Sequence, residues 1–512
     1  MRRILILALF ALPLFAQKEV GTVTFANSGK PEAQHAFARG MALLHNFEYE
    51  FAQEAFQEAQ KADPAFAMAY WGEAMTHTHP IWFQQDREAA RAVLAKLGAT
   101  PAERFAKTPT ERERDYLRTL DVLYGEGEKN ARDFLYADAM AALHARYPDD
   151  IDARAFYALS LLGTAHEGRD FAIYMLAAAL LEEVFPANMK HPGVLHYLIH
   201  SYDDPVHAPL GMRAARLYGD VAPNAGHALH MTSHIFVAMG MWDDVIAANR
   251  RAIDVVNEQR AAVSRPANDC GHYPTWLHYG LLQKGRIADA RKALEVCRAS
   301  AFVEKFIPGA PSETQRYRLV EYAEMRAQLV AAGLPLTKAD AAAIPAGVTA
   351  PRAQYTMAYT DALDASQRGD AAALKAAAER LRALQASAAS ARRSDTNPAE
   401  RIRDEVMLQE VEALELVAAG KRDAAIAILE SAAKAESAMP LEFGPPIVAK
   451  PAAELLAEQL VAAGRVSDAA AAYQLVLDRT PGRARAVEGM GRLEQVKKTA
   501  APETKVETPH VH

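Results

Sequence analysis

The chain has 512 residues and a formal net charge of −7, with 57 Lys and Arg against 64 Asp and Glu. This mildly acidic balance, without any run of Lys and Arg, argues against nucleic acid as a partner, because a phosphate backbone requires a basic patch. Beyond the first residues, no stretch holds the roughly 18 unbroken apolar residues of a membrane-spanning helix, so no membrane insertion is expected.

The first residues have the pattern of a secretory signal peptide. Two arginines precede an apolar run that ends at Ala16, and the next residue is the polar Gln17. The apolar run is too short to span a bilayer. The pattern predicts a signal peptide over residues 1–16 and an exported bacterial protein, periplasmic or secreted.

The rest of the chain is predicted to form short helices. Ala, Leu, Glu and Arg are abundant, apolar residues recur every three or four positions, and Gly or Pro interrupts the pattern at short intervals. Strand signals are almost absent. The fold class predicted from these features is all-α.

A repeated pattern of small and large residues indicates how the helices are paired. Residues 36–64 read AFARGMALLHNFEYEFAQEAFQEAQKADP, and similar patterns begin at Gly240, Gly285, Gly420 and Gly464. The pattern resembles the tetratricopeptide repeat (TPR) family, in which small residues let two helices of a hairpin approach closely and a proline ends the second. The resemblance implies a right-handed superhelical solenoid of helical hairpins, in one array or two sub-arrays.

The repeats divide the sequence into predicted segments. After the signal peptide these are a lead-in (17–30), an N-terminal repeat array (31–300), a degenerate helical region with a linker (301–400), a C-terminal repeat pair with a capping helix (401–497) and a disordered tail (498–512).

Two matched pairs of histidines stand out in the N-terminal array. His196 and His200 are four residues apart, as are His230 and His234, and the two pairs are separated by 34 residues. Four residues is about one helical turn, so each pair faces one way. The resemblance to the TPR family implies that these four residues and His227 lie at groove-lining positions on the concave face of the solenoid.

The chemistry of these five imidazoles favours a metal site. Imidazole is the commonest neutral metal ligand, and two histidines one turn apart can chelate one ion. Without thiolates nearby, such a site suits a transition metal such as Zn, Cu or Fe rather than Ca or Mg. The alternative is that the imidazoles are half-buried and hydrogen-bonded to carbonyl and carboxylate groups.

Further residues are candidates for an accessory role. His45 and His79 are also separated by 34 residues. Asp203, Asp204 and His207 follow His200, and a carboxylate there could bind a metal or orient an imidazole. These residues could equally begin the next loop and helix.

The two cysteines, Cys270 and Cys297, flank one predicted hairpin. The ends of an antiparallel hairpin are neighbours, and an oxidising compartment permits a disulfide. The alternative is two unlinked buried thiols.

Two functions fit these features. The first is an exported solenoid that binds a protein or peptide in its groove and carries a transition-metal site. The second is a metal-dependent enzyme of the oxidase or hydrolase type that uses the histidine cluster. The sequence holds no HExxH, GxSxG, phosphate-loop or CxxCH motif that would specify a reaction.

Overall fold

The computed structural model of the chain describes residues 19–302, 312–338, 340, 344, 348–391 and 398–500. The predicted signal peptide lies outside the described residues. So does the predicted tail, except for residues 498–500, which end the last helix. None of the helices in the described part is long and apolar enough to cross a membrane.

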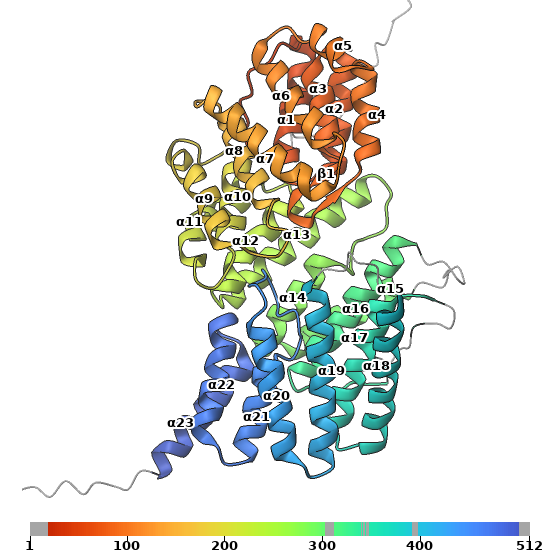
Figure 1. The fold of residues 1–512 in the computed structure, drawn as a ribbon, viewed down its shortest axis with the longest axis vertical. Helices are drawn as coiled ribbons and strands as arrows, with labels where there is room; N and C mark the ends of the chain where they lie inside the picture. Colours follow the sequence, from red (N-terminus) through yellow and green to blue (C-terminus); the bar gives the residue numbers. More distant parts are fainter. Residues whose placement is uncertain are drawn as a thin grey trace, which may run out of the picture.

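The described residues form α-helices joined by short loops, with a single two-stranded hairpin (Figure 1). The elements are α1 (Pro31–His45), α2 (Tyr49–Ala62), α3 (Ala67–Met75), β1 (Thr78–His79), η1 (Pro80–Trp82), β2 (Gln84–Gln85), α4 (Arg87–Leu97), α5 (Pro101–Ala106), α6 (Glu111–Leu123), α7 (Lys129–Arg146), α8 (Ile151–Leu162), α9 (Phe171–Glu182), η2 (Phe185–Ala187), α10 (Pro192–Tyr202), α11 (Ala208–Val221), α12 (Gly226–Ala238), α13 (Trp242–Ala262), α14 (His272–Gln283), α15 (Ile287–Ala301), α16 (Glu313–Ala331), α17 (Pro351–Gln367), α18 (Ala371–Ala391), α19 (Pro398–Ala418), α20 (Arg422–Ser437), α21 (Ala452–Ala462), α22 (Val466–Arg479) and α23 (Ala484–Ala500). The strands β1 and β2 are antiparallel.

Consecutive helices pack as antiparallel hairpins, and several hairpins share one turn. In the turn after α12, the amides of Gly240 and Met241 donate to carbonyls three and five residues back, and Gly240 has a φ of +66°. The same hydrogen bonds and a positive-φ glycine recur after α14, α19 and α21. Glycine suits these turns because it lacks the Cβ that penalises left-handed backbone. The predicted all-α solenoid of TPR-type hairpins is confirmed.

Two large apolar cores hold the solenoid together. The first extends from the N-terminal segment to α14, and the second from α16 to α23. A smaller core around α14, α15, α16 and α17 connects them. In Figure 1 the two parts lie above and below a junction formed by α12, α13 and α14.

The C-terminal hairpins return to this junction. The indole nitrogen of Trp242 donates to the carbonyl of Gly482 (2.9 Å), and Arg483 donates to the hydroxyl of Tyr279 (3.1 Å). Arg483 is buried and paired with Glu454 on α21. Arg483 also donates to the carbonyl of Ala449 (3.0 Å) in the loop that precedes α21, so this loop lies close to α14.

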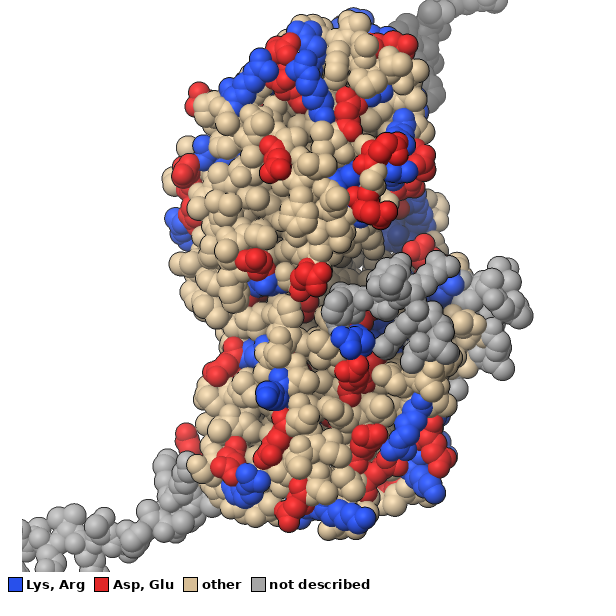
Figure 2. All heavy atoms as spheres, viewed as in Figure 1, with Lys and Arg blue, Asp and Glu red and all other residues tan. Residues whose placement is uncertain are grey.

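Cys270 and Cys297 form a disulfide that joins the residues just before α14 to α15. At the surface, Lys and Arg side chains alternate with Asp and Glu over the face drawn in Figure 2, without a broad basic patch.

Candidate metal centre

The five histidines predicted as metal ligands come together in the structure. His196 and His200 lie on α10, and His227, His230 and His234 lie on α12. All five are buried. The sequence places them on an open concave groove, and in this respect the structure differs, because aromatic side chains and a distant loop cover them.

A sixth histidine completes the cluster as two sets of three. His272, the first residue of α14, joins His230 and His234, while His196 and His200 join His227. Within each set the ligand nitrogens lie within 4.8 Å of one another. We name these sets triad A (His196, His200, His227) and triad B (His230, His234, His272). Each triad takes two histidines from one helix and the third from the first turn of a following helix.

Neighbouring groups determine which ring nitrogen carries the proton. The Nδ1 of His196 lies 2.6 Å from the carbonyl oxygen of His45, which can only accept a hydrogen bond. The Nδ1 of His230 donates to Oδ1 of Asn249 (2.7 Å), since the amide nitrogen of Asn249 donates to a backbone carbonyl instead. The Nδ1 of His234 donates to Asp203 (2.9 Å). In all three rings the Nε2 atom is therefore the one with a free lone pair.

The Nε2 atoms of five of the six histidines receive no hydrogen bond from the described residues. The Nε2 atoms of His196, His200 and His227 are buried without a hydrogen-bond partner among the described residues. In triad B, the Nε2 atoms of His230 and His234 face each other at 3.2 Å. Two nitrogens bound to one tetrahedral ion at about 2.0–2.1 Å lie about 3.3 Å apart, so this spacing fits a shared ion.

Burial favours the neutral form of five of the six imidazoles, and this is the form that a metal ligand requires. Burial lowers the pKa of His196, His227 and His230 well below the usual value, and neighbouring imidazoles add to the effect. It also lowers the pKa of His234 to about 4, although Asp203 opposes the change, and that of His272 to about 3.

Asp203 connects the two triads. Its Oδ2 atom accepts from His234 and lies 3.3 Å from Nδ1 of His200, while Oδ1 pairs with the buried Arg169. Burial alone would raise the pKa of the Asp203 carboxyl. Arg169 and the two imidazoles lower it by more, so the pKa lies well below its usual value and the carboxyl stays ionised. Asp203 thus orients one ligand of each triad from behind the ring.

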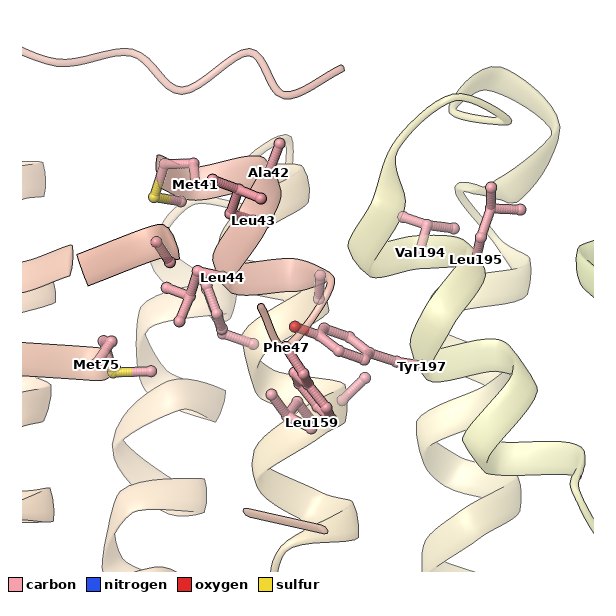
Figure 3. Close-up of a cluster of buried hydrophobic side chains, with 14 of the residues drawn as sticks. Met41, Ala42, Leu43, Leu44, Phe47, Met75, Leu159, Val194, Leu195 and Tyr197 are labelled. Carbon is pink, nitrogen blue, oxygen red and sulfur yellow. The ribbon is translucent and has the colours of Figure 1, made fainter. Parts of the chain in front are cut away.

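Aromatic rings enclose the centre. The ring of Phe47 lies 4.2 Å from that of His196 and stacks on His227 at 5.5 Å, while Trp276 stacks on His234 at 4.6 Å. Figure 3 shows Phe47 next to Tyr197, between the end of α1 and α10.

Phe47 has a φ of +57° in a turn with the same hydrogen bonds as the glycine turns above. A left-handed backbone costs a non-glycine residue on the order of 1–2 kcal/mol. Phe47 keeps this strained backbone at the position from which its ring covers His196 and His227 of triad A.

The loop between α20 and α21 closes the centre from the C-terminal part of the chain. We name residues 440–450 the cover loop. Phe443 stacks on His234 (4.9 Å) and meets His200 edge-on (6.1 Å). Gly444, with a φ of +94°, lies so close to Trp276 that a Cβ atom would stand 2.3 Å from the indole.

The structure places the accessory candidates in different surroundings. His45 is bonded through its ring to Asp152 and the hydroxyl of Tyr197, and only its backbone carbonyl reaches the centre. His79 bonds the carbonyl of Thr76 and stacks on Tyr49. Of these candidates, Asp203 alone has a side chain bonded to the histidines of the triads.

Asp204 and His207 pair with each other beside the centre. The imidazole of His207 donates to Asp204 (2.9 Å), which also pairs with Arg169 and accepts from the backbone amides of Val206 and His207. His207 therefore lies outside both triads.

His272, Phe47 and Phe443 were not predicted. The interval from His227 to His272 is 45 residues rather than 34, since α13 and the loop after it are long. Counting from the turn glycines gives the missing signal: His227 and His272 both lie 13 residues before a turn glycine, Gly240 or Gly285.

No protein-family model and no curated protein matches the chain. Among solved structures it is similar to a chain of the APC/C hetero-tetramer Cut9–Hcn1 (11% identity over 92% of this chain and 78% of that chain, TM-score 0.34). It is also similar to yeast Tom70 (10%, 92% and 97%, TM-score 0.32) and to the TPR domain of P58(IPK) (11%, 92% and 99%, TM-score 0.21). These superpositions are loose, and no property of those proteins is transferred to this chain.

Proposed function

We propose that this chain is a metalloprotein that binds transition-metal ions on the six histidines of triads A and B. The observation that carries the proposal is the set of buried Nε2 atoms, three without a hydrogen-bond partner in the described part of the chain and two facing each other at 3.2 Å. A buried polar atom without a hydrogen bond costs about 1–3 kcal/mol, and a bound cation would remove that cost for every member of a triad.

We further propose that the protein acts outside the cytoplasm. The signal-peptide pattern at the N-terminus and the Cys270–Cys297 disulfide support this location, because disulfides persist in oxidising compartments. Zn, Cu and Fe are all compatible with a nitrogen-only ligand set.

Metal analysis of the untagged protein tests the proposal. Purified wild type should contain a transition metal, or take it up from Zn, Cu or Fe solutions, and a chelator should lower its melting temperature. The variant His196→Ala/His200→Ala should lose at least half of this capacity, while His207→Ala should retain it. Wild type that takes up none of these metals would contradict the proposal.

A protein-binding role is the second candidate, and exposed apolar side chains support it. Phe171 and Leu176 on α9 and Leu210 on α11 are large and about half exposed. Solenoids commonly present such surfaces to partners. Chemical cross-linking in the native host should give partner adducts that a Leu176→Asp/Leu210→Asp variant loses; equal adducts would exclude this surface. The histidines themselves lie too deep to contact an extended peptide.

A further inference from the structure

The two triads are close enough to act as one unit, and this inference rests on the metal centre proposed above. The rings of His200 and His234 are 5.5 Å apart, and those of His227 and His230 are 6.1 Å apart. Each of these pairs joins one member of triad A to one of triad B. Ions held by the two triads would therefore be neighbours, with Asp203 behind both.

The charge of the surroundings restricts which ions fit. No ligand of either triad is a carboxylate or a thiolate, and the nearby carboxylates Asp203 and Asp204 share one buried cation, Arg169. Two divalent ions would place four positive charges in a buried site, where uncompensated charge is costly. Two cuprous ions bring only two, and copper binds readily to imidazole.

The enclosure restricts what can react there. Phe47, Trp276 and Phe443 cover the rings of both triads, so a large or strongly hydrated substrate has no open approach. A metal-bound water could lose its proton without a protein base, so the enclosure and not a missing base separates the possible reactions. It favours a small uncharged reactant over the larger substrate of a hydrolase.

We propose that triads A and B hold a pair of cuprous ions and that dioxygen is the ligand of this pair. In the binding step each copper ion loses one electron, so two cuprous ions become cupric. One dioxygen molecule receives both electrons and becomes a peroxide dianion bonded to both ions. No proton moves, and the dianion offsets the two charges that the metals gain.

Anaerobic loading with copper(I), followed by exposure to dioxygen, tests this proposal. Wild type should bind two equivalents of copper and consume one dioxygen per two coppers. The oxidised copper should be silent in electron paramagnetic resonance, because the spins of two adjacent bridged cupric ions couple.

Disabling triad B provides the matched comparison. His230→Ala/His234→Ala should bind one equivalent of copper, and its oxidised form should give the signal of an isolated cupric ion. His272→Ala removes a less buried ligand and serves if the double variant does not fold; it should weaken copper binding at triad B alone. The control His207→Ala should behave as wild type.

The outcomes separate this proposal from the one on which it rests. Wild type that binds a single copper, or two coppers that give isolated cupric signals after oxidation, overturns the paired site. Paired copper that consumes no dioxygen overturns the choice of ligand. Wild type that takes up no Zn, Cu or Fe overturns the metal centre itself.

Discussion

At the scale of single residues, orientation of the imidazoles depends on groups behind the rings. The carbonyl of His45, the amide of Asn249 and the carboxylate of Asp203 each receive an Nδ1 proton and leave Nε2 free. Because Asp203 contacts one imidazole of each triad, its loss should weaken metal binding at both triads.

Asp203→Asn should therefore weaken metal binding by about 10–100-fold, the usual effect of losing a partner behind a ligand. It should also destabilise the protein by about 3 kcal/mol, since Arg169 loses its main buried counter-charge. Titration calorimetry and thermal unfolding would measure the two effects. Asp220→Asn removes an exposed carboxylate and is the control. Equal metal affinity in Asp203→Asn and wild type would show that the carboxylate has no orienting role.

At the scale of elements, two connections deliver residues to the centre from outside α10 and α12. The cover loop brings Phe443, and the Cys270–Cys297 disulfide fixes the segment that begins with His272. Each can be altered without touching a ligand.

Gly444→Ala should displace the cover loop. The added methyl group would stand 2.3 Å from Trp276. Alanine would also have to adopt the left-handed backbone of Gly444, which costs about 1–3 kcal/mol. A chelator should then remove the metal faster than from wild type. Gly420→Ala imposes similar backbone strain, with a φ of +74°, but meets no neighbouring atoms, so its chelation rate should stay unchanged. Equal rates for all three proteins would mean that the loop does not control access.

Cys270→Ser/Cys297→Ser should lower the free energy of unfolding by about 3 kcal/mol, because the bridge closes a loop between residues 27 apart. Since His272 lies two residues after Cys270, metal binding at triad B should weaken while triad A keeps its affinity. Metal titrations and denaturant unfolding of the variant and wild type would show this. A uniform loss at both triads would indicate general unfolding instead.

At the scale of the whole molecule, buried histidines make stability depend on pH. Burial lowers the pKa of His234 and His278 to about 4 and that of His272 to about 3. In the unfolded chain these groups titrate near pH 6.5, so between about pH 6.5 and pH 4 the unfolded state binds more protons. The free energy of unfolding of the metal-free protein should therefore fall as the pH drops through this window.

Glu436 acts in the opposite direction. Burial raises its pKa to about 7, so the folded state holds an extra proton between about pH 4.5 and pH 7. Burial also raises the pKa of four other glutamates (Glu48, Glu321, Glu410 and Glu442), but ten histidines have a lowered pKa, so the melting temperature should still fall from pH 6.5 to pH 4.5. Glu436→Gln should make the fall steeper, and a flat profile in both proteins would contradict the assignment.

Local pattern was sufficient to predict part of this molecule. Turn glycines and helical periodicity predict the hairpins, because each hairpin is built from neighbouring residues. The pairs His196/His200 and His230/His234 follow from one helical turn. The position of Phe443 beside His234 depends on the path of more than 200 residues between them, and no short-range pattern encodes that path. The repeat interval of 34 is not a reliable guide to the site: His79 shares this spacing with His45, but its ring bonds the carbonyl of Thr76 and stacks on Tyr49, outside both triads.

The two triads occupy successive steps of the solenoid: His196 and His200 on α10 correspond to His230 and His234 on α12, and His227 on α12 corresponds to His272 on α14. At the next step, the positions that correspond to His230 and His234 hold Thr275 and Tyr279. The series of histidines ends at α14 because these two positions hold no imidazole, although the helical hairpins continue beyond it. Under the metal centre proposed above, the number of bound ions equals the number of steps that carry three histidines, so each added hairpin with the same three histidines would add one ion.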